Sequence, residues 1–212
     1  METLVARLLL PALLLMPLDG AISTISSPSH KVARASQHKF PNAHGDSRKV
    51  GEGPLRRFVV ETERATKVDP DLFADRVERI LFDHGSWAGK RVALKRVARG
   101  THAFNVTLAT RDTTDRLCYP YRTNGIFSCY NNGRAVINVW RWRNGADSYG
   151  KQIRRYRRYL INHEVGHALG QSHRSCTGDG DPAPTMVQQT KSLYGCTRNE
   201  WPLRWERRTL DP

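Results

Sequence analysis

The sequence has no apolar run long enough to cross a membrane. Its main apolar run, Leu8–Leu18, has eleven residues, whereas a transmembrane helix needs about 20. The run follows a short start with one basic residue, Arg7, and small residues follow it from Gly20 onward. This layout is typical of a secretory signal peptide over residues 1–21, with cleavage near that end, so we expect an extracellular protein. An uncleaved N-terminal membrane anchor is the alternative.

Cysteine is scarce: there are four, all in the second half of the chain, and no two of them form a C-x-x-C pair. The missing C-x-x-C spacing argues against a zinc site built from four thiolates. An even number of cysteines behind an export signal favours disulfides, for which the sequence allows three pairings. We expect near neighbours to pair, Cys118 with Cys129 and Cys176 with Cys196.

Acidic residues are few, 20 against 34 lysines and arginines, which gives a formal net charge of +14. Loss of residues 1–21 would remove two acidic residues and one basic residue, and would raise this charge to +15. The basic residues are scattered except at 154–158, where four of five residues are arginine. No groove-reading motif or aromatic stacking platform accompanies them, so specific nucleic-acid binding is not expected. The charge fits contact with an anionic cell-wall polymer.

Residues 22–55 have hardly any apolar periodicity and are rich in Ser, His, Lys and Gly. Such a segment cannot bury enough apolar surface to offset the entropy lost on ordering. We therefore predict a flexible linker or a propeptide, followed by one folded domain over residues 56–212. No internal repeat is apparent, and we expect a monomer.

The pattern from Arg56 onward predicts an α+β domain, in which one mixed sheet packs against two main helices. Asp69-Pro70-Asp71 is typical of a helix start, because it combines a capping side chain, a proline in the first turn and a second acid. The expected strands are 57–61, 91–97, 103–109 and a hairpin with arms 127–130 and 135–140, joined by Asn131-Asn132-Gly133. The C-terminal part, residues 171–212, is expected to be irregular.

A second, long helix is predicted over residues 148–169. Apolar and histidine side chains recur there at steps of three and four and so share one face. These side chains are Ile153, Tyr156, Leu160, His163 and His167. Gly170 is suited to end the helix, because glycine adopts positive φ readily.

The stretch N-H-E-V-G-H-A-L-G-Q-S-H, residues 162–173, predicts a metal site. His163 and His167 are four residues apart on a helix, so their imidazoles can share one zinc ion. The turn at Gly170 lets the chain double back and bring His173 in as the third ligand. Three ligands leave one position open for water, and Glu164 is placed to accept a proton from that water. The bare H-E-x-x-H pattern is common by chance, whereas this extended form is rare.

Residues 163–173 match the signature of the metzincin zinc peptidases. More closely, the stretch from about Phe58 to Pro202 resembles a family of secreted actinobacterial proteins catalogued as a domain of unknown function and regarded as metzincin-like. The segments that carry this likeness are 136–138, 159–164 and 186–191. The resemblance implies a metzincin-like catalytic domain over residues 56–212 and one catalytic Zn²⁺ ion.

The same resemblance assigns roles downstream of the histidines. Met186 is the candidate for the methionine that metzincins carry in a tight turn beneath the metal. Gln188 stands where some metzincins have a tyrosine that stabilises the oxyanion, so Tyr194 is the remaining candidate for that role. No cysteine lies upstream of residue 118, which excludes latency through a cysteine switch.

We therefore expect a secreted zinc-dependent endopeptidase that hydrolyses peptide or protein substrates. An extended substrate strand would bind between the strand near 135–140 and the long helix. Two alternatives remain open: an amidase that uses the same zinc site on cell-wall peptides, and a non-catalytic binding module that contains a metal. Glu164 argues against the binding module, because a structural site has no use for a base.

Overall fold

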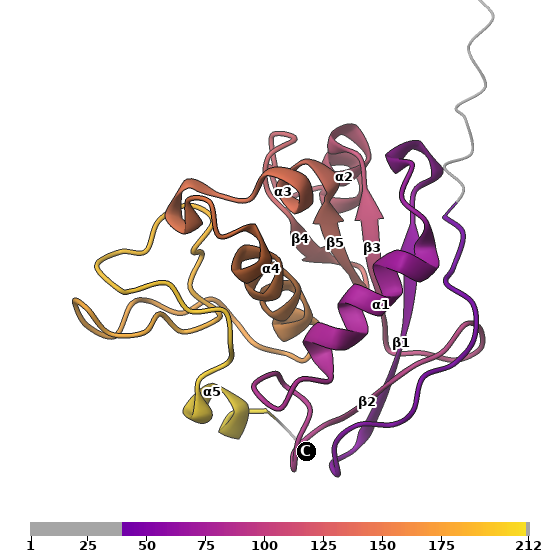
Figure 1. Cartoon of the computed structure of the whole chain (residues 1–212), viewed down its shortest axis with the longest axis horizontal. Helices are drawn as coiled ribbons and strands as arrows, with labels where there is room; N and C mark the ends of the chain where they lie inside the picture. The colour runs from indigo at the N-terminus through magenta and orange to yellow at the C-terminus, as the bar shows by residue number, and fades with distance from the viewer. Residues whose placement is uncertain (1–39, 211–212) are drawn as a thin grey trace, which may run out of the picture. The chain divides into compact units, whose positions relative to one another are not determined.

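The structure, a computed structural model, describes residues 40–210, all of which belong to one compact unit of the chain (Figure 1). The predicted signal peptide over residues 1–21 and the first part of the predicted linker, residues 22–39, lie outside the described residues. No helix within residues 40–210 has the length and apolar character needed to cross a bilayer.

A five-stranded sheet forms the centre of the domain, in the order β2-β1-β3-β5-β4. Its strands are β1 (Leu55–Thr62), β2 (Ala93–Arg96), β3 (Phe104–Ala109), β4 (Cys129–Asn131) and β5 (Arg134–Asn138). Four of them are parallel, and β4 alone runs antiparallel, beside β5. The predicted mixed sheet of an α+β domain is confirmed.

The helices cover both faces of this sheet. They are α1 (Pro70–Leu81), α2 (Arg111–Cys118), α3 (Val139–Asn144), α4 (Ile153–Ala168) and α5 (Arg204–Arg208). In Figure 1, α1 and α4 cross the same face, α1 against β1 and α4 against β4 and β5. The short helix α2 packs against β4 and β5 from the other side.

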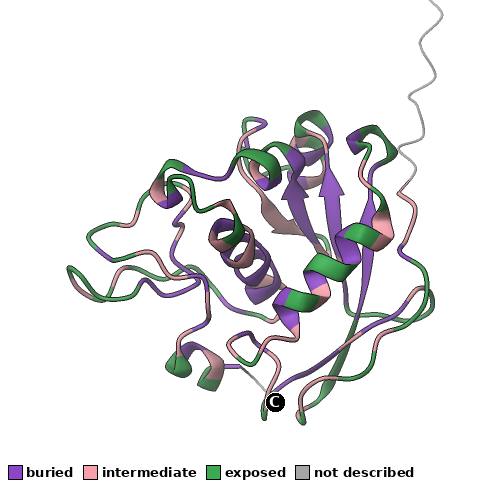
Figure 2. Cartoon of the chain, in the orientation of Figure 1, coloured by how far each residue is buried: buried purple, intermediate pink, exposed green. Residues whose placement is uncertain are grey.

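The alternation of side chains along the strands explains this layering. Ala135 and Ile137 of β5 belong to the main core under α1 and α4, whereas Val136 packs with Ala109 and Cys118 beneath α2. Successive side chains of a strand point to opposite faces, so β5 is buried on both. Figure 2 shows this strand and the inner face of α4 as buried. The buried half of α4 is the half that carries His163.

Residues 40–55, predicted as part of a flexible linker or propeptide, pair with the sheet in the structure. Val50 exchanges backbone hydrogen bonds with Leu94 of β2, and Asn42 forms a bridge with Glu61 of β1. The side chain of Ala43 is 2 % exposed and belongs to the core. The prediction of a flexible segment up to residue 55 is therefore wrong for residues 40–55, because backbone pairing with the sheet orders a segment that has little apolar surface of its own.

Two predicted boundaries differ from those in the structure, the start of α4 and the end of β5. Helix α4 begins at Ile153 rather than at residue 148, because Gly150 has positive φ and separates it from a short 3₁₀ turn, Asp147–Tyr149. Strand β5 ends at Asn138 rather than at residue 140. There the Asn138 side chain accepts a hydrogen bond from the backbone N–H of Trp140 and begins α3.

The hairpin of β4 and β5 turns at Asn132 and Gly133, both with positive φ, as the sequence predicted. The exposed edge of the sheet is β4, however, and β5 lies between β3 and β4. The strand near residues 135–140 is thus not available for pairing with a substrate. On this side of the sheet, an added strand would pair with Cys129–Asn131 instead.

Both disulfides have the pairing expected from the sequence. Cys118–Cys129 joins the end of α2 to β4, and Cys176–Cys196 closes a loop in the C-terminal region. The second loop contains Met186, and Ala183 and Val187 pack against its two cysteines.

Candidate metal centre

Helix α4 presents His163 and His167 on the same side, with ring centroids 4.9 Å apart. Gly166 lies between them and faces the core. A Cβ atom at this position would lie 2.5 Å from the sulfur of Met186 and 2.8 Å from a ring carbon of Trp87. Glycine at this position lets Met186, which is fully buried, and Trp87 pack directly against the helix.

The chain reverses after α4 and returns the third histidine. Gly170 has a φ of 85°, and the backbone N–H of Gln171 donates to the carbonyl of Gly166. After this turn, Nε2 of His173 lies 3.1 Å from Nε2 of His167. One ligand nitrogen from each of the three histidines lies within 4.8 Å of the others. Nitrogens on a tetrahedral zinc ion are about 3.3 Å apart, given Zn–N bonds of about 2.0–2.1 Å, so the three residues fit such an ion.

Backbone carbonyls orient two of these imidazoles. Nδ1 of His163 donates to the carbonyl oxygen of Thr185 at 2.8 Å, and Nδ1 of His167 donates to that of Gln171 at 2.7 Å. Carbonyls only accept, so the proton lies on Nδ1 and the lone pair on Nε2, the atom that faces the other histidines. Partners of this kind fix the tautomer of metal-ligating histidines. Sequence reasoning brought the three histidines together but identified neither carbonyl.

The electrostatics of the pocket keep these imidazoles neutral. Burial lowers the pKa of His163 to about 3 and that of His167 to about 4. The pKa of His173 is lowered in the same way, with a further contribution from the charge of Lys191. Neutral imidazole is the form that binds a metal ion, so no proton needs to be displaced at neutral pH.

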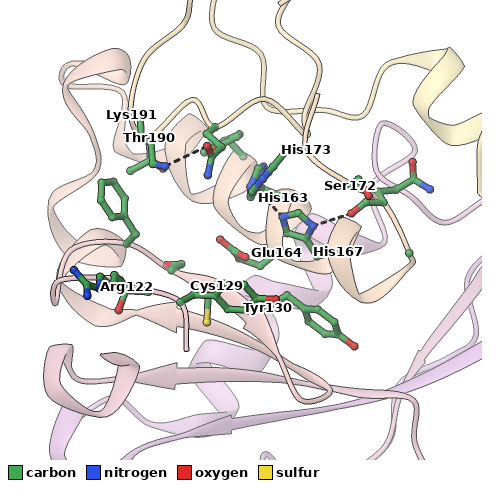
Figure 3. A pocket seen from close by; sticks show the side chains of 18 residues that line it. Arg122, Cys129, Tyr130, His163, Glu164, His167, Ser172, His173, Thr190 and Lys191 are labelled. Atoms are coloured by element: carbon green, nitrogen blue, oxygen red, sulfur yellow. Dashed lines mark hydrogen bonds between the residues drawn. The ribbon is translucent and has the colours of Figure 1, made fainter. Parts of the chain in front are cut away.

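Glu164 lies beside the histidines and lines the same cleft, with 4 % of its surface exposed (Figure 3). Burial raises the pKa of this carboxyl to about 8. A nearby cation would lower that pKa again through its charge. The group can therefore hold or release a proton near neutral pH, as a general base requires.

The turn that carries Met186 is held by a carboxylate that sequence reasoning missed. Glu206 of α5 is fully buried and accepts hydrogen bonds from the backbone N–H groups of Thr185, Met186 and Leu203, at 2.8–3.0 Å. Burial raises the pKa of Glu206, and the three N–H donors act in the opposite direction. Glu206 is thus connected to His163 through one peptide group, that between Thr185 and Met186: its N–H donates to Glu206 and its carbonyl accepts from His163. No local motif marks Glu206, which lies 43 positions after His163.

An open cleft of about 670 Å³ surrounds these groups. The edge strand β4 and the loop before it form one wall, and the segment after Met186 forms the other (Figure 3). The residues that line the cleft are Tyr121, Arg122, Thr123, Phe127, Ser128, Cys129, Tyr130, Tyr159, His163, Glu164, His167, Gly170, Gln171, Ser172, His173, Gln188, Thr190 and Lys191. Cys129 and Tyr130 of the edge strand therefore border the same cleft as the three histidines.

The structure does not bring Tyr194 to this cleft. Its side chain is 53 % exposed on a turn with positive φ, and it is not among the lining residues. The prediction that Tyr194 assists an oxyanion therefore has no geometric support. Tyr130 of the edge strand and Tyr121 before it do line the cleft.

Comparison with known proteins identifies a family. A family model described as "Protein of unknown function (DUF3152)" matches residues 26–201. The match includes the three histidines, Glu164 and Met186. Neither the curated proteins nor the solved structures contain a match to the chain.

Proposed function

The chain belongs to the DUF3152 family, and we propose that it is a secreted, metzincin-like zinc peptidase that hydrolyses peptide bonds in extended substrates. The observation that carries the proposal is the convergence of three neutral imidazoles on one point of an open cleft, with a buried carboxylate beside them. A purely structural zinc site uses four protein ligands. Three ligands and an open side are typical of a catalytic one.

The residues would hold one zinc ion through Nε2 of His167 and His173 and the same atom of His163. When bound, zinc supplies Lewis acidity that makes water more acidic and a carbonyl more electrophilic. The Glu164 carboxylate would take the proton from the attacking water and pass it to the departing nitrogen. The Thr185 and Gln171 carbonyls keep the imidazoles in the required tautomer throughout.

Three further features support the metzincin-like assignment. Met186 packs against Gly166 of the helix that carries the first two histidines, which is compatible with the role that the resemblance gives it. The edge strand β4 borders the cleft and has one side free for an added strand. Two disulfides fit an oxidising compartment, in agreement with the signal peptide that the first 21 residues predict.

The test is digestion of a complex peptide library by the purified whole chain loaded with zinc, read by mass spectrometry. We expect cleavage that is lost with a chelator and falls about 10²-fold or more in Glu164→Gln, because that variant cannot take up the proton. Glu52→Gln is the matched control, since Glu52 is exposed and lies outside the cleft.

Absence of cleavage by a chain that holds one zinc ion would overturn the peptidase proposal. A parallel panel of cell-wall peptides with amide bonds to sugars addresses the amidase alternative. Cleavage confined to that panel would assign the same site to a different bond.

A further inference from the structure

Two cations lie at one end of the cleft without an acidic partner. Lys191 is on the wall formed by the segment after Met186, and Arg122 is on the opposite wall, before β4 (Figure 3). Phe127 lies at the same end, with its ring centroid 5.5 Å from the Lys191 ammonium. Both charged side chains are exposed, and neither forms an ion pair within residues 40–210.

Elsewhere in the domain, three arginines near the core pair with carboxylates. Arg96 contacts Glu78, Arg134 contacts Glu61 and Arg155 contacts Glu200. Among the residues that line the cleft, in contrast, Glu164 is the one carboxylate, and its position beside the histidines reserves it for proton transfer. The ammonium of Lys191 has one hydrogen-bond partner among the described residues, the neutral side chain of Gln188 at 3.2 Å.

Both cations are carried on segments held in place. On the Lys191 side, the Tyr156 hydroxyl contacts the Thr190 hydroxyl at 3.1 Å, and the Tyr149 hydroxyl donates to the Gln189 side chain at 2.8 Å. On the other side, the Asp115 carboxylate accepts hydrogen bonds from Thr123 and from the backbone N–H of Gly125. Because the backbone on both walls is ordered in advance, an anion that binds there has only the two side chains to order.

We propose that Lys191 and Arg122 select substrates that carry a carboxylate close to the scissile bond, on the Phe127 side of the histidines. The inference rests on the proposed peptidase function and names its substrate class: peptides with an acidic residue, or with their own C-terminal carboxylate, at that position. In this arrangement the apolar part of the substrate would pack against the Phe127 ring, and its carboxylate would lie between the two walls that carry the cations. An exposed ion pair contributes little by itself, but two charges on opposite walls of one cleft add to the same positive potential and contribute more.

The test uses quenched fluorescent peptides built on one cleaved library sequence. Each peptide varies only near the scissile bond: Glu against Gln within the chain, and a free C-terminus against a C-terminal amide. We expect kcat/KM to favour the carboxylate member of at least one pair by about tenfold at low salt, and the ratio to shrink as salt screens the charges. The two pairs separate an acidic side chain from a chain end.

Variants then assign the preference to its residues. Lys191→Gln and Arg122→Gln should each reduce the ratio toward one, and Lys191→Glu should favour a lysine peptide instead. Arg154→Gln is the matched control. Arg154 is exposed on α4 and does not line the cleft, and its substitution by Gln removes the same charge. An unchanged ratio in all three cleft variants would overturn the inference.

Binding to the Glu164→Gln protein keeps this test separate from that of catalysis. Fluorescence anisotropy with the same labelled peptides should show tighter binding of the carboxylate members, and loss of that difference in the Lys191→Gln, Glu164→Gln double variant. Cleavage without any preference, or equal binding of acid and amide peptides, would contradict the carboxylate site and leave the peptidase proposal intact. Carboxylate-dependent binding, with no cleavage by the unmodified protein, would support the carboxylate site and contradict the peptidase proposal.

Discussion

At the scale of single residues, the candidate site depends on groups that never touch a substrate. The Thr185 carbonyl orients His163, and Glu206 accepts a hydrogen bond from the Met186 N–H of the same peptide group. Gly166 leaves the space in which Met186 packs. Partners of this kind commonly change metal affinity by 10- to 100-fold when they are removed. The three histidines are therefore only the innermost part of the site.

Glu206→Gln is predicted to destabilise the metal-free protein and to weaken zinc binding. Both carboxylate oxygens accept backbone N–H groups, and an amide nitrogen in place of one oxygen would face a donor. We expect a loss of about 1–3 kcal/mol in the free energy of unfolding, from urea titration. Zinc affinity, measured by competition with a chelator, should fall about tenfold. Arg204→Gln on the same helix, an exposed position, should change neither quantity.

At the scale of elements, α2 and the loop after it show how a polar segment is ordered by its neighbours. The Glu63 carboxylate accepts hydrogen bonds from the backbone N–H of Thr110 and from the Thr113 hydroxyl, and so holds the first turn of α2. Cys118 ties its last residue to β4. The Asp115 carboxylate then fixes the loop that carries Arg122. One wall of the cleft thus depends on three residues that do not line it, Glu63, Asp115 and Cys118.

Asp115→Ala is predicted to destabilise the protein in a pH-dependent way. Hydrogen bonds from Thr123 and Gly125 lower the pKa of Asp115 below its usual 3.8. A carboxyl whose pKa is lowered on folding contributes stability above the pKa of the unfolded chain, and this contribution is lost as the pH falls through the folded pKa. We expect a deficit of about 1–2 kcal/mol at pH 7, from the two lost hydrogen bonds, that narrows below pH 4.

The measurement is urea unfolding at pH 7 and at pH 3. Asp112→Ala on the same helix is the control, because its side chain is exposed and has no hydrogen bond to the loop. An equal deficit for Asp115→Ala at both values of pH would show that the charge of Asp115 does not hold the loop.

At the scale of the whole molecule, the site joins parts of the chain that are distant in sequence. The first two histidines lie on α4, Met186 lies within a disulfide-closed loop, and Glu206 lies on the last helix. Trp87, between α1 and β2, packs against the same place and donates its indole N–H to the carbonyl of Asn162. A ligand at the histidines should therefore stabilise the domain as a unit rather than one loop.

Zinc is predicted to raise the midpoint of thermal unfolding, and a chelator to lower it again. Binding to the folded state alone stabilises by RT ln(1 + [L]/Kd), about 2.7 kcal/mol at a free zinc concentration 100 times Kd. The shift should persist in Glu164→Gln, which keeps the ligands, and disappear in His167→Ala. A shift of the same size in His167→Ala would mean that zinc binds elsewhere, for example at exposed histidines.

Features that depend on local spacing could be predicted from the amino-acid sequence. The grouping of His163, His167 and His173 follows from helical periodicity and a glycine turn, the hairpin follows from Asn132-Gly133, and the start of α1 follows from Asp69 and Pro70. Each of these signals lies within about a dozen residues, where the geometry of the backbone dictates which side chains meet. The same is true of the near-neighbour disulfide pairs.

Features that depend on contacts between distant segments became visible in the tertiary structure alone. Pairing with the sheet orders residues 40–55, and sheet order puts β4 at an edge. Glu63 holds the first turn of α2. No local sequence pattern reveals these contacts. Glu206 and the cations Arg122 and Lys191 reach the site from separate segments. Sheet order and buried polar contacts are set by which distant segments pack together, because a buried hydrogen-bonding group must find its partner wherever the fold supplies one.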